Sequence, residues 1–65
     1  MKRLIVDYSL IGQGREFELT LLRRERKGLE VGSQVEVVGD GVPPRIAEVM
    51  AVSRDEKVFE FTFAD

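Results

Sequence analysis

The stretch KGLEVGSQVEVVGDGVPPR, residues 27–45, holds four glycines, two adjacent prolines and a short run of alternating valines. A Walker-type phosphate loop needs Gly-x-x-x-x-Gly-Lys-Ser/Thr, so that backbone amides and one lysine meet the phosphates. Neither GLEVG nor GDGVPPR supplies the Lys-Ser/Thr pair, and neither is followed by a helical pattern. We therefore interpret the glycines as turn residues. The segment between them reads as a strand with Val35 and Val37 facing inward.

The same alternation of apolar and polar side chains recurs along the chain, and it is typical of half-buried strands. It predicts strands over residues 3–8, 15–22 and 58–63. Residues 45–53 are strand-like but change phase, which a β-bulge near Ala47 would resolve. The predicted core consists of Phe17, Leu19, Leu21, Val35, Val37, Val49, Phe59 and Phe61.

Turn-forming segments separate these strands: GQG at 12–14, GDGVPP at 39–44 and RDEK at 54–57. No long window keeps the helical spacing of apolar residues without a glycine or proline, although TLLRRERKG at 20–28 leaves room for one helical turn. At 65 residues the chain is predicted to be one domain, residues 1–65. We expect an all-β fold: a small antiparallel barrel of five or six strands, of the Greek-key or Src-homology-3-like kind.

The pattern Gly-apolar-x-apolar-Gly-x-x-Val-x-Val within the quoted stretch is carried by Gly28, Leu29, Val31, Gly32, Val35 and Val37. It resembles the middle of the β-barrel domain that follows the GTPase domain in translation elongation factors. The preceding DYSLIGQGREFELTLLRR is similar to the first hairpin of that domain. The resemblance covers roughly residues 4–40 and implies a barrel fold. It carries no activity over, because these 65 residues contain no GTPase domain and Ser33 stands where that family often has an acidic residue.

Composition argues against most enzyme classes. The chain has no cysteine and no histidine, which removes thiolate sites, the commonest metal ligand and the commonest general base. Its serines therefore have no histidine to activate them. Nearly all of the strand carboxylates fall at outward positions, as expected of a solvated surface; the six are Asp7, Glu16, Glu18, Glu36, Glu48 and Glu60. We predict no catalytic residue, no cofactor, no metal site and no enzymatic activity.

The apolar runs are far shorter than the roughly 20 residues needed to span a bilayer. The opening MKRLIVDYSL has the charge of a signal peptide, but Asp7 interrupts its apolar run and no small-residue cleavage site follows. We therefore expect a soluble, cytoplasmic protein without a membrane partner.

Charge is unevenly distributed along the chain. Residues 1–29 carry seven Lys/Arg and four Asp/Glu, whereas residues 30–65 carry three and eight, and the total is −2. The densest basic cluster is Arg23, Arg24, Arg26 and Lys27. It suits phosphate contacts with nucleic acid, yet a solvated strand end protected from aggregation explains it as well, and the isoelectric point of about 5.1 favours the latter.

The second candidate for recognition is the loop GDGVPPR, with Asp40 in the loop and Arg45 at its exit as an anchor for an acidic partner. Stiffening of the connection by its prolines is the structural alternative. Three functions follow from these clusters. The leading hypothesis is a non-enzymatic module that binds a protein partner through loops or an edge strand. The alternatives are a nucleic-acid-binding barrel and a structural subunit that assembles as a homo-oligomer.

Overall fold

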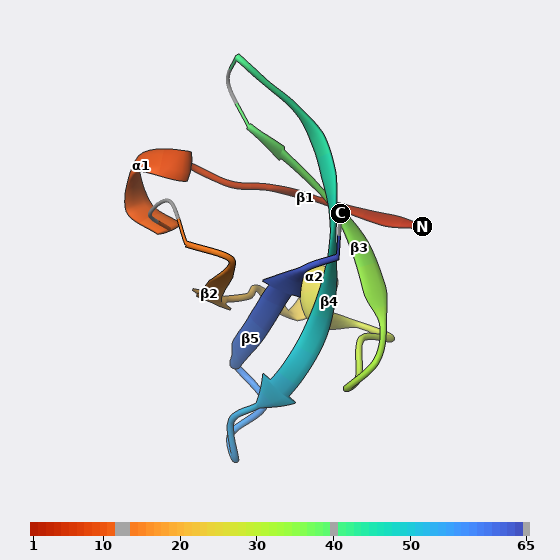
Figure 1. The fold of residues 1–65 in the computed structure, drawn as a ribbon. Helices are drawn as coiled ribbons and strands as arrows, with labels where there is room; N and C mark the ends of the chain where they lie inside the picture. The colour runs from red at the N-terminus through yellow and green to blue at the C-terminus, as the bar shows by residue number, and fades with distance from the viewer. Residues whose placement is uncertain (12–13, 40, 65) are drawn as a thin grey trace.

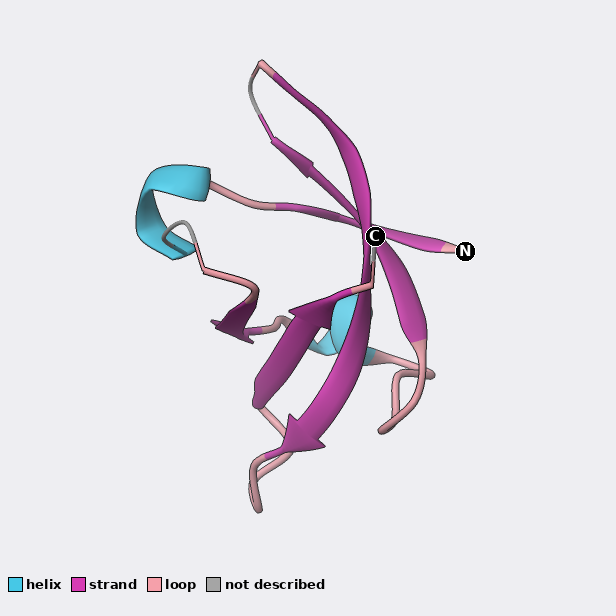
Figure 2. Ribbon diagram, in the orientation of Figure 1, coloured by secondary structure: helices cyan, strands magenta, loops and turns pink. Residues whose placement is uncertain are grey.

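The alternating segments form the strands of one five-stranded sheet (Figure 1). The computed structural model of the chain describes residues 1–11, 14–39 and 41–64. The strands are β1 (Lys2–Ile5), β2 (Glu16–Thr20), β3 (Gln34–Gly39), β4 (Val42–Val52) and β5 (Val58–Phe63). Two single-turn helices interrupt them, α1 (Tyr8–Ile11) and α2 (Arg23–Arg26). The prediction of an all-β fold is confirmed (Figure 2).

The strands lie in the order β1-β3-β4-β5-β2. Three of the four pairings are antiparallel, whereas β1 runs parallel to β3, with Lys2 opposite Val35 and Leu4 opposite Val37. The prediction of an entirely antiparallel sheet is therefore wrong at this pair. A parallel pair needs a long connection, and the segment containing α1, β2 and α2 provides it. β1 and β2 are the two edges, so the mixed sheet is not closed into a barrel.

One face of each strand contributes to a single apolar core. The buried residues are Leu4, Val6, Phe17, Leu21, Val35, Val37, Ala47, Val49, Phe59, Phe61 and Phe63. The ring of Phe17 stacks on Phe61 with 5.1 Å between centroids, and it lies 4.8 Å from the ring of Phe63. Seven of the eight predicted core residues are thus buried. Leu19 is half-buried and packs against the core.

Two expectations for residues 42–53 are wrong. The irregularity in the β4–β5 pairing lies between Val49 and Ala51 rather than near Ala47, which is itself fully buried. The prolines expected in a loop, Pro43 and Pro44, belong to β4. They are tolerated there because β5 first pairs at Ala47, so this end of β4 has only β3 beside it and needs no donor on its other side.

The first strand is shorter than predicted. It ends at Ile5, and Tyr8, which was expected at its end, begins α1. The carboxylate of Asp7 accepts hydrogen bonds from the backbone amide of Ser9 (2.9 Å) and from its hydroxyl (2.6 Å). These bonds turn the chain out of the extended conformation, as Asp side chains do at helix starts. They also lower the pKa of Asp7 below its ordinary value.

The polar turn predicted between the last two strands is present. The hydroxyl of Ser53 donates to the carboxylate of Asp55 at 2.5 Å, and the amide of Lys57 donates to the same carboxylate at 3.1 Å. Ser53 also accepts from the amide of Val58, so one carboxylate and one hydroxyl organise the hairpin. The hydrogen bond from Ser53, followed by that from Lys57, lowers the pKa of Asp55.

This lowered pKa predicts an acid-sensitive hairpin. A carboxyl group whose pKa is lower in the folded state stabilises the fold above its unfolded pKa, and that contribution is lost as the pH falls through the folded pKa. The variant D55N should therefore lose less thermal stability between neutral pH and pH below 3.8, the ordinary Asp value, than the unmodified protein loses. Thermal unfolding at a series of pH values measures this. Parallel pH profiles for the two proteins would contradict the prediction.

Candidate functional site: a basic hollow beside α2

The basic cluster lies on α2 and the residue after it. The amide of Leu22 donates to the carboxylate of Glu25 at 2.8 Å, which satisfies an amide left free at the helix start. Amides of Arg26 and Lys27 then donate to the carbonyls of Leu22 and Arg23, at 3.0 and 3.2 Å. Gly28, at φ +82°, ends the turn in the left-handed conformation that glycine adopts freely. The helical turn for which the sequence left room is therefore formed.

Side-chain hydrogen bonds hold this segment against the sheet. The ammonium group of Lys2 on β1 donates to the carbonyl oxygens of Arg24 and Lys27, both at 3.0 Å. Nη1 of Arg26 donates to the carbonyl of Leu21 at 3.2 Å. All three acceptors are carbonyl oxygens within α2 or next to it. Because a helix of one turn has little stability of its own, these bonds help to hold it in place. The guanidinium groups of Arg23 and Arg24 take no part in these bonds.

The next turn positions the opposite wall. The amide of Ser33 donates to the carbonyl of Glu30 at 2.9 Å, with Gly32 at φ +94° between them. Such a turn requires a positive φ at its third residue, which is why glycine stands there. The amide of Gly32 donates to the carbonyl of Val49 at 2.9 Å and so ties the turn to β4. The interpretation of both glycines in GLEVG as turn residues is confirmed.

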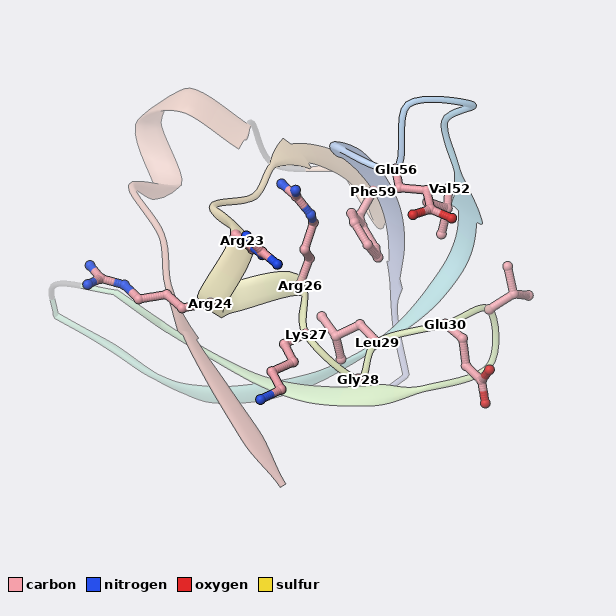
Figure 3. A pocket seen from close by; sticks show the side chains of 11 residues that line it. Arg23, Arg24, Arg26, Lys27, Gly28, Leu29, Glu30, Val52, Glu56 and Phe59 are labelled. Atoms are coloured by element: carbon pink, nitrogen blue, oxygen red, sulfur yellow. The ribbon is translucent and has the colours of Figure 1, made fainter.

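A hollow of about 950 Å³ opens between α2, this turn and the ends of β4 and β5 (Figure 3). Its lining consists of Arg23, Arg24, Arg26, Lys27, Gly28, Leu29, Glu30, Val31, Val52, Glu56 and Phe59. The half-buried Leu29 and Val52 and the buried Phe59 supply an apolar surface continuous with the core. The side chain of Val31 is 63% exposed. The side chain of Arg24 points away from the other labelled side chains in Figure 3.

The hollow is positively charged in a protein of net charge −2. Four cations and two carboxylates line it, which leaves two positive charges. Glu25, the carboxylate within the cluster, is held by the amide of Leu22. Within the described part of the chain, Arg3 and Glu36 form an ion pair, with 2.6 Å between Nε and Oε1, and neither residue lines the hollow. The exposed side chains of Arg23, Arg24 and Lys27 are therefore available to an anionic ligand, and their charged groups can only donate hydrogen bonds.

The predicted site residues do not all come together. Arg23, Arg24, Arg26 and Lys27 share the hollow, whereas the guanidinium carbon of Arg45 lies over the ring of Phe63 at 3.7 Å. That cation–π contact gives Arg45 a role in covering the core. Asp40 lies outside the described residues. No signal in the sequence pointed to Leu29, Val52 and Phe59 as site residues, because their apolar character predicts core and the fold alone brings them beside the arginines.

Within residues 1–11, 14–39 and 41–64, no helix is long and apolar enough to cross a membrane. The same residues contain no group of three or more acidic side chains arranged to hold a metal ion. No protein-family model matches the chain, and neither a curated protein nor a solved structure does so. The site is therefore interpreted from its own residues, and none of these comparisons links the chain to translation factors.

Proposed function

We propose that this protein is a non-enzymatic binding module whose basic hollow, the α2 hollow, recognises an acidic segment of a protein partner. One observation carries the proposal: the uncompensated cations of residues 23–27 line the same hollow as the apolar side chains of Leu29, Val31 and Val52. Cations at a rim steer an acidic partner and fix its orientation, and an apolar anchor in the centre supplies most of the affinity.

The aromatic residues favour a protein partner over single-stranded nucleic acid. Nucleic-acid-binding barrels stack bases on exposed aromatic side chains. All four phenylalanines of this chain are buried, at 7% exposure or less, and the single tyrosine, Tyr8, is half-buried against the core. An acidic peptide needs no stacking platform, and it can place an apolar side chain against Leu29 and Val52.

We also infer that the sheet acts as a small barrel left open between β1 and β2. Support comes from the core, in which Leu4 of one edge strand and Phe17 of the other belong to one cluster. The eleven-residue β4 pairs with β3 along its first part and with β5 along its second. An open barrel of this kind is a rigid frame on which a short helix and its turns can carry recognition.

The test is a titration of backbone amide chemical shifts with a short peptide of glutamates around one central leucine. We expect shifts at residues 23–31 and at Val52, and Kd about tenfold weaker for R23Q/R24Q, which corresponds to about 1.4 kcal/mol. R54Q is the matched control, because Arg54 is an exposed cation in the β4–β5 turn that does not line the hollow. It should bind almost as well as the unmodified protein.

Two further ligands sharpen this experiment. A peptide with lysine in place of glutamate should leave the spectrum unchanged. A single-stranded RNA should bind more weakly than the acidic peptide; tighter binding that falls steeply with salt would support a phosphate-binding function instead. Equal losses of peptide affinity in R23Q/R24Q and R54Q would contradict a role for the α2 hollow, because they would reflect overall charge alone.

A further inference from the structure

A second hollow, of about 260 Å³, opens at the other edge of the sheet, where β2, β5 and β4 run side by side. Its lining consists of Glu16, Phe17, Glu18, Met50, Glu60 and Phe61. The phenylalanines are buried, so the accessible side chains are three carboxylates around Met50, which is 49% exposed. This acidic hollow has the same design as the α2 hollow with the opposite charge: an apolar centre and a charged rim.

The carboxylates of the acidic hollow repel one another. Glu18 lies directly opposite Glu60 in the β2–β5 register. Glu16 on β2 and Glu48 on β4 lie on either side of Thr62 on β5, each directly opposite it. Like charges directly opposite each other destabilise a sheet, and none of these four glutamates forms an ion pair within the described residues. They do not converge into a metal-binding group either. A cationic protein surface would relieve this repulsion.

The chain itself carries such a surface. Leu22 is 59% exposed, and the exposed cations Arg23 and Arg24 follow it directly. This segment is complementary to the acidic hollow: its apolar side chain can contact Met50, and its two guanidinium groups can pair with the carboxylates around Met50. Glu60 lies between the buried Phe59 and Phe61, so the carboxylates of the acidic hollow project from the face of the sheet away from the core, whereas the α2 hollow opens onto the core residue Phe59. These carboxylates and the α2 segment can therefore meet only between two molecules.

We propose that a second copy of this chain is a partner of the α2 segment, residues 22–27, which docks on the acidic hollow of its neighbour. The proposal rests on the proposed function, since Arg23 and Arg24, which line the α2 hollow, are the cations that bind an acidic surface in both. The contact joins two different surfaces, so it is head-to-tail, and repetition of it builds rings or open chains. Because charges at the rims carry much of the complementarity, the association weakens with salt.

Sedimentation velocity over a concentration series tests this assembly. The unmodified protein should show a mass above the 7.4 kDa of one chain, rising with protein concentration and falling with added salt. E18Q/E60Q removes charge from the acidic hollow, and R23Q/R24Q removes it from the α2 segment; each alone should be monomeric under the same conditions. Mixed in equal amounts, they retain one intact surface each and should form a species of two chains that grows no further.

E36Q is the matched control for loss of a carboxylate. Glu36 lies on β3, lines neither hollow and pairs only with the exposed Arg3 within the described residues, so its removal should leave the assembly intact. Unchanged thermal midpoints establish that each variant is folded. A monomeric mixture, or assembly of E18Q/E60Q equal to that of the unmodified protein, would overturn the proposal.

Titration of E18Q/E60Q with the acidic peptide separates this proposal from the proposed function. Peptide binding without self-association means that the α2 hollow recognises acidic segments and that the second copy is not its partner. Association of the two variants without peptide binding supports the head-to-tail contact and rejects recognition of acidic segments in general.

Discussion

Replacing Phe61 by alanine is expected to lower the free energy of unfolding by about 3–5 kcal/mol, the usual cost of truncating a buried aromatic side chain. Phe61 is 1% exposed and stacks between two other rings, 5.1 Å from Phe17 and 6.4 Å from Phe59. Its removal leaves a cavity between β2 and β5 that the facing rings cannot fill without leaving their own contacts. A domain of this length has a total stability of about 3–10 kcal/mol, so a large part of F61A should be unfolded.

Urea unfolding followed by circular dichroism measures this loss. F61L serves where F61A does not fold, because leucine keeps most of the apolar volume and should cost less than about 2 kcal/mol. M50A is the matched control on β4, since Met50 is half exposed and its truncation removes few contacts. Similar urea midpoints for F61A and M50A would mean that the side chain of Phe61 does not point into the core.

Replacing Gly39 by alanine is expected to destabilise the protein by about 1–3 kcal/mol through overpacking. A Cβ atom at Gly39 would lie 2.5 and 2.7 Å from Cδ2 and Cε2 of Tyr8, and 2.9 Å from the carbonyl oxygen of Val6. The ring of Tyr8 can move aside, but the carbonyl of Val6 belongs to a backbone that its own amide fixes to Val38 at 2.8 Å. Relief of the clash therefore requires β1 and β3 to separate.

G14A is the control for this substitution. A Cβ atom at Gly14 would meet nothing closer than the carbonyl oxygen of Glu16, at 3.8 Å, an ordinary contact distance. Loss of glycine also restricts the unfolded chain, which stabilises the protein by about 0.4–1 kcal/mol where the native conformation suits alanine. G14A should thus be as stable as the unmodified protein or slightly more so. Equal stability of G39A and G14A would exclude the close approach of Tyr8 to Gly39.

Much of the candidate site was visible in the sequence as charge. Four consecutive or nearly consecutive cations at residues 23–27 are a local feature, and they stay together in any fold that leaves them exposed. The acidic hollow was not visible, because Glu18 and Glu60 are far apart in the chain and only the β2–β5 register places them opposite each other. In the sequence each was one more outward residue of an alternating strand.

The prediction that Arg45 anchors an acidic partner rested on its position at the exit of a glycine- and proline-rich loop. In the structure β4 begins before Arg45, at Val42. The strand then carries its guanidinium group over Phe63, a residue of β5. Whether a charged side chain meets solvent or an aromatic ring depends on the strand that pairs beside it.

The sequence by itself determined which residues of the regularly alternating strands β2, β3 and β5 face the core. Extended backbone alternates its side chains regardless of neighbours, so Phe59, Phe61 and Phe63 share a face wherever β5 is placed. The tertiary structure alone decided the parallel pairing of β1 with β3 and the open edges of the sheet. It also decided that Leu29, Val52 and Phe59 lie beside the basic cluster. These arrangements depend on hydrogen bonds and contacts between distant segments, and no local pattern of side chains encodes which strands will meet.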